Sequence, residues 1–286
     1  MDSEEDLVAL DELFDLVTEC DGHRPIGEHK YLDLLQLDNG GGGLIGEVDG
    51  ELVAYLAVGY SSERNTCAIE IALHPLHRQS GHLERLVEAG VDHARARGAD
   101  MVRMWAFQPN YVEVLLNMGF HEERELRQVR RSLPYQGDFE FPDGFELRTF
   151  RPGVDEEAWL AVNNTAFAGH PENGSWTIEV FEDREAQPWF APEGFLMAWS
   201  GDELAGFCWT KRHNGMGEIY VIAVAPKFQG RSLGRSLVIE GLQNMARRGM
   251  TTAMLYMDAS NTRAAALYES LGFRLDHVDR SLVRSI

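Results

Sequence analysis

The chain contains two copies of one structural unit, and this internal duplication constrains the fold more than any other feature of the sequence. The run "LIGEVDGELVAYLAV" (44–58) matches "LMAWSGDELAGFCWT" (196–210), because each places two apolar stretches around an Asp/Gly turn, as a β-hairpin requires. In the same order, "IEIALHP" (69–75) matches "YVIAVAP" (220–226), and "NMGF" (117–120) matches "SLGF" (270–273). The members of each pair lie 151 to 153 residues apart. Three ordered matches at a nearly constant separation indicate a tandem repeat.

Each copy alternates strands with helices. A hairpin is followed by a buried strand that ends at a proline, then by a helix, a strand and a last helix that ends at Gly-Phe. In the second copy the patterns predict a helix over 232–249, a strand over 252–258 and a helix over 261–272. The predicted fold class is therefore α/β, with one domain at 1–138 and a second at 139–286, joined near the Pro- and Gly-containing stretch 133–147.

The composition argues against several classes of function. The chain has 46 acidic and 26 basic residues and a net charge of -20, and phosphate binding by a nucleic-acid partner needs clustered Lys and Arg. The three cysteines, Cys20, Cys67 and Cys208, lie far apart and predict neither a disulfide framework nor a metal site. The first residues are acidic, unlike a signal peptide, and no apolar run reaches the roughly 18 residues of a membrane span. We therefore expect a cytoplasmic protein without a membrane partner, and a monomer is compatible with the sequence.

The stretch "QGRSLGRS" (229–236) joins the strand that ends at proline to the next helix. The first N–H groups of a helix lack internal partners and favour anions. Gly230 and Gly234 keep side chains away from this surface, and three cationic residues add positive charge nearby: Lys227, Arg231 and Arg235. The stretch matches neither the P-loop nor the GxGxxG pattern. It is either an ordinary turn or a site for the phosphates of a cofactor.

This loop and the later run "NTRAAALYESLGF" (261–273) resemble the GNAT acetyltransferases, whose acyl-CoA loop reads Q/R-x-x-G-x-G/A. The resemblance implies two tandem GNAT domains, each a mixed, mostly antiparallel sheet flanked by helices. It also implies acetyl-CoA as the acetyl donor, and no metal. The residues that it implies for acyl-CoA binding in the second copy are Ile222, Ala223, Val224, Gln229, Gly230, Arg231, Ser232, Leu233, Gly234, Arg235, Asn261, Thr262, Arg263, Ala264, Ala265 and Ala266.

Three further stretches are similar to the mycothiol synthases, a two-domain family of this superfamily: "VNNTAFAGHPENGSWT" (162–177), "GFCWTK" (206–211) and "GEIYVIAV" (217–224). That family acetylates the cysteinyl amine of desacetylmycothiol, a cysteine–glucosamine–inositol conjugate. The resemblance therefore implies two small-molecule partners, desacetylmycothiol and acetyl-CoA. The residues that it implies for acceptor binding are Glu28, Glu172, Lys211, Glu218 and Tyr256.

Amide formation from acetyl-CoA needs an amine without its proton, a polarised thioester carbonyl and a stabilised thiolate. Alternation along the strand before the loop places four side chains on one face: Glu218, Tyr220, Ile222 and Val224. A carboxylate there is suited to accept the amine proton, and the resemblance makes Glu218 the expected base. The resemblance also places the N–H that binds the carbonyl oxygen at Val224. Tyr268, two helical turns after Asn261, is suited to hydrogen-bond the departing thiolate. The alternatives are an edge-strand charge for Glu218 and core packing for Tyr268.

The first copy lacks both proposed reactive side chains. In the repeat alignment, Cys67 occupies the position of Glu218, and Leu115 occupies that of Tyr268. The corresponding loop, "RQSGHLER" (78–85), keeps a glycine but has Leu83 where the GNAT pattern has a second small residue. We therefore expect a catalytically silent first domain that contributes Glu28 to the acceptor site. Acyl-CoA binding in this copy stays open and would use Ile71, Ala72 and Leu73.

Three functions are compatible with the sequence. The first is acetyl-CoA-dependent N-acetylation of desacetylmycothiol. The second is acetylation of another amine, such as an aminoglycoside or a small metabolite, by a tandem GNAT enzyme. The third is a catalytically silent acyl-CoA sensor, which the presence of Glu218 and Tyr268 disfavours.

Overall fold

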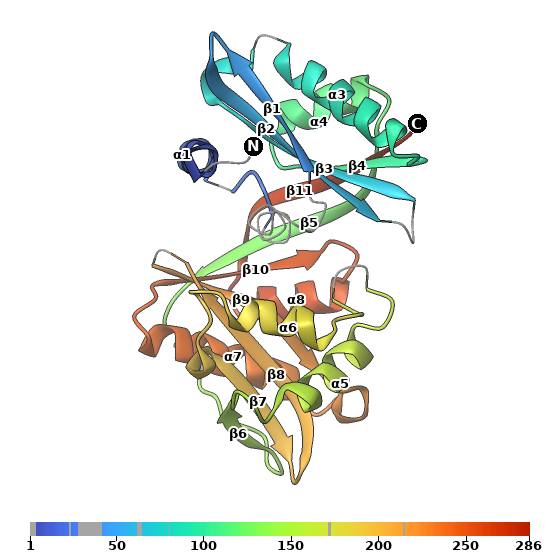
Figure 1. The fold of residues 1–286 in the computed structure, drawn as a ribbon. Coiled ribbons are helices and arrows are strands. Elements are labelled where there is room, and N and C mark those ends of the chain that lie inside the picture. The colour runs from blue at the N-terminus through green and yellow to red at the C-terminus, as the bar shows by residue number, and fades with distance from the viewer. Residues whose placement is uncertain are drawn as a thin grey trace. The chain divides into compact units, whose positions relative to one another are not determined.

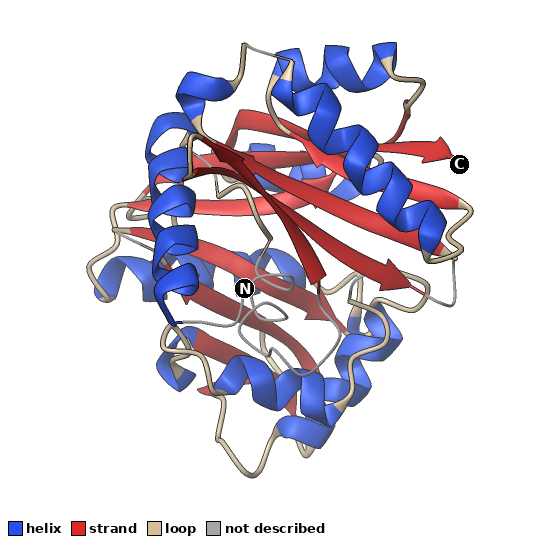
Figure 2. Cartoon of the chain, turned by 45° about the horizontal axis from the view of Figure 1, so that its top comes forward, coloured by secondary structure: helices blue, strands red, loops and turns tan. Residues whose placement is uncertain are grey.

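The computed structural model describes residues 4–22, 24–27, 42–61, 65–79, 81–170, 173–213 and 215–286. The chain divides into two compact units, which we call unit 1 (Met1–Leu126 with Val278–Ile286) and unit 2 (Arg127–His277). Figure 1 shows the elements as a ribbon, and Figure 2 shows that both units consist of strands covered by helices. The predicted α/β fold is therefore confirmed. None of the helices in these ranges combines the length and apolar character needed to cross a membrane.

Unit 1 is a sheet with helices on both faces. Its strands follow the order β1-β2-β3-β4-β11, in which β11 (Arg274–Ser285) comes from the end of the chain. Its elements in chain order are α1 (Glu4–Asp21), β1 (Gly42–Val48), β2 (Glu51–Ser61), β3 (Thr66–Leu73), the 3-10 turn η1 (Pro75–His77), α3 (His82–Ala96), β4 (Met101–Ala106), α4 (Pro109–Asn117) and the first part of β5 (His121–Ser132). The hairpin predicted over 44–58 is formed by β1 and β2, which pair antiparallel.

The strand β2 is apolar on both faces, so that helices of unit 1 pack against each of them. Leu56 and Val58 point into a core that they share with Val87 of α3. Tyr55 and Ala57 point the opposite way and pack against α1. Because side chains alternate along a strand, one continuous apolar run supplies both cores.

Unit 2 repeats this architecture. Its strands follow the order β5-β10-β9-β8-β7-β6. After β5 its elements are β6 (Glu146–Thr149), α5 (Glu156–Ala166), α6 (Ile178–Glu185), η2 (Pro192–Gly194), β7 (Phe195–Ser200), β8 (Glu203–Arg212), β9 (Met216–Val224), η3 (Pro226–Phe228), α7 (Leu233–Arg247), β10 (Thr252–Asp258), α8 (Thr262–Ser270) and the first residues of β11 (Arg274–Ser285). The predicted hairpin over 196–210 and the elements predicted over 232–272 are therefore confirmed within two residues.

Two cores lie on opposite faces of the sheet in unit 2. The α7/α8 core contains Leu237 and packs against Cys208 of β8. The α5/α6 core contains Trp159 and packs against Trp209, the next residue of β8. Figure 1 shows α5 and α6 in front of these strands. A side chain that packs in one of these two cores therefore points to that face of the sheet.

The division between the units differs from the boundary at 138/139 that the composition suggested. The connecting stretch carries Tyr135, Phe139 and Phe145, which pack against the α7/α8 core and so belong to unit 2. At the end of the chain, Arg280–Ser285 of β11 pair antiparallel with Met101–Ala106 of β4 in unit 1. Apolar packing and strand pairing therefore set the division, and neither is visible in the composition of the linker.

Candidate active site

The strands β9 and β10 of unit 2 separate partway along their length. Among the described residues, their parallel ladder is confined to Met216–Glu218 of β9 and Thr252–Met254 of β10. Both strands continue beyond the ladder, β9 to Val224 and β10 to Asp258. The ladder therefore opens directly after Glu218. The strand edges at such an opening present backbone N–H and C=O groups to a ligand.

A β-bulge lies in β9 just beyond the start of this opening. Trp209 of β8 pairs with Val221, and Thr210 pairs with Ile219, so that Tyr220 is the extra residue on β9. Ile219 packs in the α7/α8 core, whereas Val221 packs in the α5/α6 core. The bulge therefore reverses the face to which each later side chain points.

The prediction that four alternate side chains of β9 share one face is wrong for this reason. Glu218 precedes Ile219 and so points toward the α5/α6 side, where Tyr220 also packs. Ile222 and Val224 instead pack against the α7/α8 core. Alternation predicts only a regular strand, and the sequence carries no signal for the inserted residue.

Two residues of the neighbouring strand and its turn accompany Glu218. Its carboxylate Oε2 lies 2.7 Å from Nε2 of His213. Lys211 stands directly opposite Glu218 in the ladder, which puts both side chains on the α5/α6 face. The side chain of Glu218 is 13% exposed and that of His213 is 34% exposed. His213 was not predicted; it follows Lys211 by two residues and lies just after β8, which ends at Arg212.

The ammonium of Lys211 lies against aromatic rings. Its Nζ is 4.3 Å from the centre of the Trp189 ring and 5.4 Å from that of Tyr220, and the residue is 9% exposed. Nε of Arg184, from α6, donates to the Tyr220 hydroxyl at 3.2 Å. Cation–π contacts of this kind stabilise a charge that has lost water. Tyr220 is thereby fixed beside Glu218.

Tyr256 lies on β10, two residues beyond Met254, the ladder partner of Glu218. Its neighbour Leu255 packs in the α7/α8 core, so that Tyr256 points to the α5/α6 face. The Tyr256 hydroxyl accepts a hydrogen bond from Nε2 of Gln128 at 2.7 Å. Three of the five predicted acceptor residues therefore lie on one face beside the opening.

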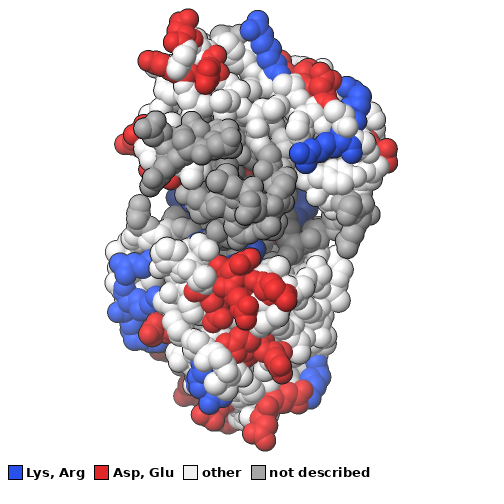
Figure 3. Space-filling model, viewed as in Figure 1, with Lys and Arg blue, Asp and Glu red and all other residues white. Residues whose placement is uncertain are grey.

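The other two predicted acceptor residues, Glu28 and Glu172, lie outside the described residues. The described surface near the site is acidic, because three carboxylates of α6 are exposed: Glu179, Glu182 and Asp183. Figure 3 shows acidic side chains gathered over α6. Within the described ranges, no group of three or more His, Cys, Asp or Glu side chains is arranged to hold a metal ion.

Tyr268 lies on the opposite face of the sheet from Glu218. It belongs to α8, is 8% exposed and packs in the α7/α8 core, with its ring centre 5.7 Å from that of Phe273. Burial raises the pKa of its phenol, and the Cys208 thiol raises it further. Tyr268 therefore keeps its proton through neutral pH. Tyr268 therefore packs in the core, as the alternative reading of the sequence expected. Its protonated hydroxyl is also able to donate a hydrogen bond.

The backbone of β9 beyond Glu218 is oriented toward the opening. The N–H of Ala225 donates to the carbonyl of Ala205 in β8 at 2.9 Å. Because successive N–H groups of a strand point to opposite edges, the N–H of Val224 points away from β8. The N–H of Ile222 shares this direction. A donor so placed faces the edge from which β10 has separated.

The loop that starts α7 holds two residues with left-handed backbone conformations. Gly230 has a φ of 80° and Ser232 a φ of 62°. For a residue with a Cβ atom this conformation costs about 1 kcal/mol, and such residues gather at ligand sites. In the described part of the chain, the Ser232 side chain makes no capping hydrogen bond to α7. The N–H groups of the first turn are therefore left for another partner.

The positive charge of this loop comes from two arginines rather than three cations. Lys227 forms an ion pair with Glu203 of β8, which the sequence did not reveal because Glu203 lies in an earlier strand. Arg231 is exposed. Nη1 of Arg235 donates to the hydroxyl of Ser270 at 2.8 Å and so joins the start of α7 to the end of α8.

Several predicted cofactor residues also have structural partners. The Asn261 side chain caps α8 by accepting from the N–H of Ala264 at 3.1 Å. Nε2 of Gln229 donates to the carbonyl of Val224 at 3.3 Å. Leu233 is buried, so that it offers a ligand its backbone. The remaining predicted residues of α8 are exposed or half-buried: Thr262, Arg263, Ala264, Ala265 and Ala266.

Unit 1 has the same opening in its ladder but different side chains around it. The ladder between β3 and β4 covers Thr66–Ile69 and Met101–Met104. Cys67 and Leu115, at the positions of Glu218 and Tyr268, are both buried in the core. The strand end that corresponds to 222–224 is also buried, with exposures of 9%, 0% and 1% for Ile71, Ala72 and Leu73.

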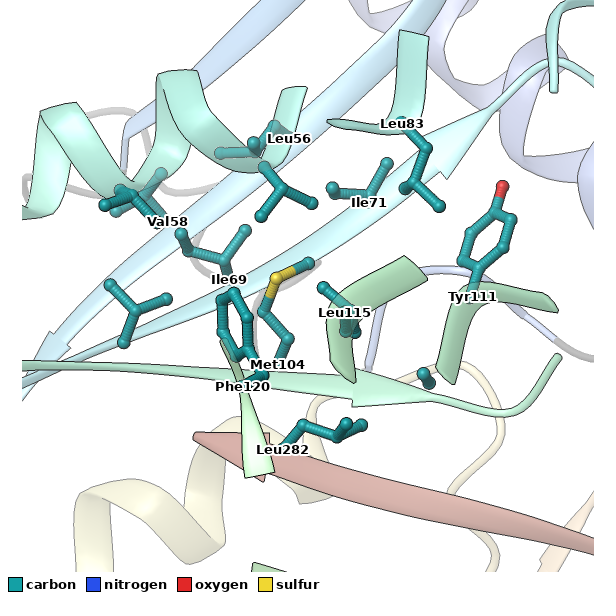
Figure 4. Packing of buried hydrophobic residues seen from close by; sticks show 14 of the residues in the cluster. Leu56, Val58, Ile69, Ile71, Leu83, Met104, Tyr111, Leu115, Phe120 and Leu282 are labelled. Atoms are coloured by element: carbon teal, nitrogen blue, oxygen red, sulfur yellow. The ribbon is translucent and has the colours of Figure 1, made fainter. Parts of the chain in front are cut away.

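Bulky side chains enter the core of unit 1 where unit 2 has small ones. Leu83 is the second residue of α3 and is 3% exposed, whereas the second residue of α7 is Gly234. Tyr111 is the third residue of α4, whereas the third residue of α8 is Ala264. Burial raises the pKa of Tyr111 to about 12. Figure 4 shows Leu83, Tyr111 and Leu115 beside Ile71.

Sequence comparisons match this architecture. The acetyltransferase (GNAT) family model matches residues 10–120 and 156–273, once in each copy. The mycothiol acetyltransferase of Streptosporangium roseum is 38% identical over 96% of this chain and 95% of its own length. That of Streptomyces bingchenggensis is 42% identical over 91% of this chain and 86% of its own length.

Solved structures share the fold. A tandem GNAT protein from the clavulanic acid biosynthesis pathway has a TM-score of 0.79 at 14% identity, covering 99% of this chain and 96% of its own. A GCN5-related N-acetyltransferase from Sphaerobacter thermophilus has a TM-score of 0.73 at 24% identity, covering 97% of this chain and 91% of its own. The chain belongs to the GNAT acetyltransferase family and, within it, to the mycothiol acetyltransferases.

Proposed function

We propose that the chain transfers the acetyl group of acetyl-CoA to the cysteinyl amine of desacetylmycothiol, which gives mycothiol and free CoA. The observation that carries this proposal is the convergence of Glu218, Lys211 and Tyr256 on one face, beside the opening between β9 and β10. The names of the relatives at 38% and 42% identity support this acceptor. Because acetyl-CoA is a cytoplasmic metabolite, we propose the cytoplasm as the site of the reaction.

Glu218 is the proposed base. The amine nitrogen attacks the thioester carbonyl carbon, a C–N bond forms, the C–S bond breaks and the nitrogen loses a proton. An α-amine has an ordinary pKa of about 7.7–8.0, so that the demand on a neighbouring carboxylate is modest at neutral pH. The low exposure of Glu218, 13%, limits competition from water for its oxygens.

Val224 and Tyr268 are proposed to stabilise the charges that develop. The N–H of Val224 donates to the carbonyl oxygen as it becomes an oxyanion, and a donor of this kind typically contributes about 2.7–4 kcal/mol. Tyr268 donates a hydrogen bond to the departing thiolate. A thiol has an ordinary pKa near 8.5, below that of a phenol, so that the phenol keeps its proton. The proton released by the amine reaches the thiolate through solvent.

The start of α7 is proposed to hold the pyrophosphate of acetyl-CoA. The N–H groups of residues 230–235 and the arginines Arg231 and Arg235 favour an anion there. The small side chains of Ala264, Ala265 and Ala266 leave room beside it for the rest of the cofactor. Asn261 contributes by capping α8 and so fixing the position of these alanines.

The acidic surface near Glu218 suits a cationic acceptor. Desacetylmycothiol carries an amine that is largely protonated at neutral pH, and exposed carboxylates attract such a ligand at low salt. The carboxylates on α6 supply this field (Figure 3). Lys211 and Tyr256 are proposed to bind sugar or inositol hydroxyls, and Glu28 and Glu172 to complete the acceptor site.

Unit 1 is proposed to be catalytically silent. Cys67 and Leu115 stand in place of the proposed base and of the proposed hydrogen-bond donor to the thiolate, and Leu83 and Tyr111 are bulky where unit 2 has a glycine and an alanine. We expect calorimetric titration with acetyl-CoA to give one site per chain. Two sites of similar affinity would show that Ile71, Ala72 and Leu73 also bind the cofactor.

The acceptor is tested by measuring free CoA release with purified protein, acetyl-CoA and a panel of amines. The panel holds desacetylmycothiol, glucosaminyl-inositol without cysteine, cysteine alone and an aminoglycoside. The proposal predicts the highest kcat/KM with desacetylmycothiol and an amide in the product. Faster turnover of the aminoglycoside would show that the chain acetylates another acceptor by the same reaction.

A further inference from the structure

His213 is the hydrogen-bond partner that the structure gives to Glu218 among the described residues. Its Nε2 lies 2.7 Å from Oε2 of Glu218, within the range of charge-assisted hydrogen bonds. From this geometry, and on the basis of the proposed function, we propose that His213 is a positioning residue for the base. It holds Oε2 and leaves Oε1 to take the proton of the acceptor amine.

The direction of this hydrogen bond follows from the chemistry of the two groups. An ionised carboxylate accepts hydrogen bonds and has no hydrogen to donate. The hydrogen between Oε2 and Nε2 therefore belongs to the imidazole. His213 carries a proton on Nε2 whether its ring is neutral or charged, and it donates that proton to Glu218.

The turn between β8 and β9 sets the backbone of His213. The backbone N–H of His213 donates to the carbonyl of Met216 at 2.8 Å, which closes the turn. Gly215, with a φ of 75°, allows the chain to reverse there. The backbone of His213 is thus set by the turn, independently of its side chain. Substitution of the imidazole is expected to leave the hairpin intact.

A positioning residue is needed here because a strong competitor faces Glu218. Lys211 lies directly opposite in the ladder, and its ammonium is held over the rings of Trp189 and Tyr220. A carboxylate that turns toward an ammonium engages its oxygens in an ion pair and loses its orientation toward the acceptor. The hydrogen bond from Nε2 of His213 engages Oε2 of Glu218 and so opposes such a turn. A shift of about 1 Å in a reacting group can cost about 100-fold in rate.

The first test compares two substitutions that differ in their ability to donate. His213→Leu removes the donor, whereas His213→Gln keeps an N–H at a similar reach. His121→Leu, at an exposed histidine of β5 in unit 1, is the matched control. We expect His213→Leu to lower kcat by about 10-fold to 100-fold with KM for acetyl-CoA unchanged, and His213→Gln to recover most of that loss. Equal losses for Leu and Gln, or no loss beyond that of the control, would overturn the proposal.

The second test asks whether His213 acts through Glu218. In a Glu218→Gln background, His213→Leu should lower kcat no further, because the group that it positions is already gone. An independent further loss of the same size as in the wild type would overturn the proposal. If the wild-type chain acetylates a different amine, only the proposed acceptor is wrong. The two kinetic tests of His213 would then be carried out with that amine.

A third measurement does not depend on turnover. The 15N shifts of the His213 ring report which nitrogen carries the proton. We expect Nε2 to be protonated in the wild type at neutral pH, with a changed shift in Glu218→Gln and no change in His121→Leu. An Nε2 without its proton in the folded wild type would overturn the proposal even if no amine were turned over.

Discussion

A buried tyrosine in a core is suited to donate a hydrogen bond and poorly suited to ionise. Tyr268 combines 8% exposure with a phenol whose pKa is raised by burial. The same side chain thus fills the α7/α8 core and presents a protonated hydroxyl at neutral pH. Its packing and its proposed role in stabilising the thiolate are compatible.

Tyr268→Phe separates the two contributions because it keeps the ring and removes the hydroxyl. We expect kcat to fall by about 10-fold to 100-fold, since a donor to the leaving group is lost. Acetyl-CoA affinity and the melting temperature should stay close to those of the wild type, because the ring packing persists. Single-turnover kinetics together with a thermal melt check this. An unchanged single-turnover rate in Tyr268→Phe would show that Tyr268 serves only in core packing.

Glu185 provides a second case in which burial shifts a pKa. Burial, together with the neighbouring carboxylates Glu156 and Glu182, raises its pKa to about 7. In the described part of the chain, its Oε1 is buried and lacks a hydrogen-bond partner. The folded state therefore holds this proton more tightly than the unfolded state does. Its contribution to stability is complete below the unfolded pKa of about 4.5 and is lost as the pH rises through about 7.

Glu185→Gln removes this titration while it keeps the shape of the side chain. We expect the variant to melt above the wild type at pH 8 by a few degrees, on the order of 2–4 °C, and the difference to shrink at pH 5. Thermal melts at the two pH values measure it, with Glu146→Gln, at an exposed glutamate of β6 in the same unit, as the control. A difference that grows toward pH 5 would contradict the sign of the pKa shift.

Individual side chains of the site were predictable to different degrees. The positions of Glu218, Lys211 and Tyr256 followed from motifs, and strand geometry explains why they share a face. The bulge at Tyr220 and the partner His213 did not, because both depend on how β8 aligns with β9. A register is a property of two strands together, and one strand's sequence does not contain it.

At the scale of elements, the two copies differ most where a helix begins. Both helices start after a residue in the left-handed conformation, Gly81 before α3 and Ser232 before α7. The first turn of α3 then carries Leu83 and Glu84, whereas that of α7 carries Gly234 and Arg235. A carboxylate and a bulky chain disfavour a phosphate, and an arginine and a glycine favour it.

We expect the size of the side chain at position 234 to determine whether acetyl-CoA binds at the start of α7. A Cβ atom there would meet only Cγ2 of Val224, at the ordinary contact distance of 3.6 Å. Gly234→Ala should therefore fold and bind acetyl-CoA with little change. Gly234→Leu, which copies Leu83, should also fold but weaken acetyl-CoA binding by at least about 10-fold, or 1.4 kcal/mol. Calorimetry measures both affinities, and full affinity in Gly234→Leu would show that the cofactor does not pass this point.

Strands and helices of the second copy were largely predictable because their apolar periods are regular. The strand predicted over 252–258 coincides with β10, and the helix predicted over 261–272 contains α8. Helix ends were less certain, because capping depends on a side chain's conformation as well as its type. Ser232 starts α7 without capping it, whereas Asn261 caps α8.

At the scale of the whole molecule, the repeat predicts two units but not which residues each contains. The last residues of the chain join unit 1 by pairing with β4, and the aromatic residues of the linker join unit 2. Both assignments rest on contacts between segments far apart in the sequence. The repeat in the sequence predicts two similar folds. It does not predict to which unit the linker and the last strand belong.

The central proposal is that, after duplication, unit 2 kept the residues for acetyl transfer whereas unit 1 is catalytically silent. The measurement that tests this claim most directly is kcat with desacetylmycothiol for two variants at corresponding positions, Glu218→Gln in unit 2 and Cys67→Ala in unit 1. We predict a loss of about 100-fold or more for Glu218→Gln with acetyl-CoA affinity retained, and a kcat within about twofold of the wild type for folded Cys67→Ala. Wild-type turnover in Glu218→Gln, or an equal loss in both variants, would contradict the account.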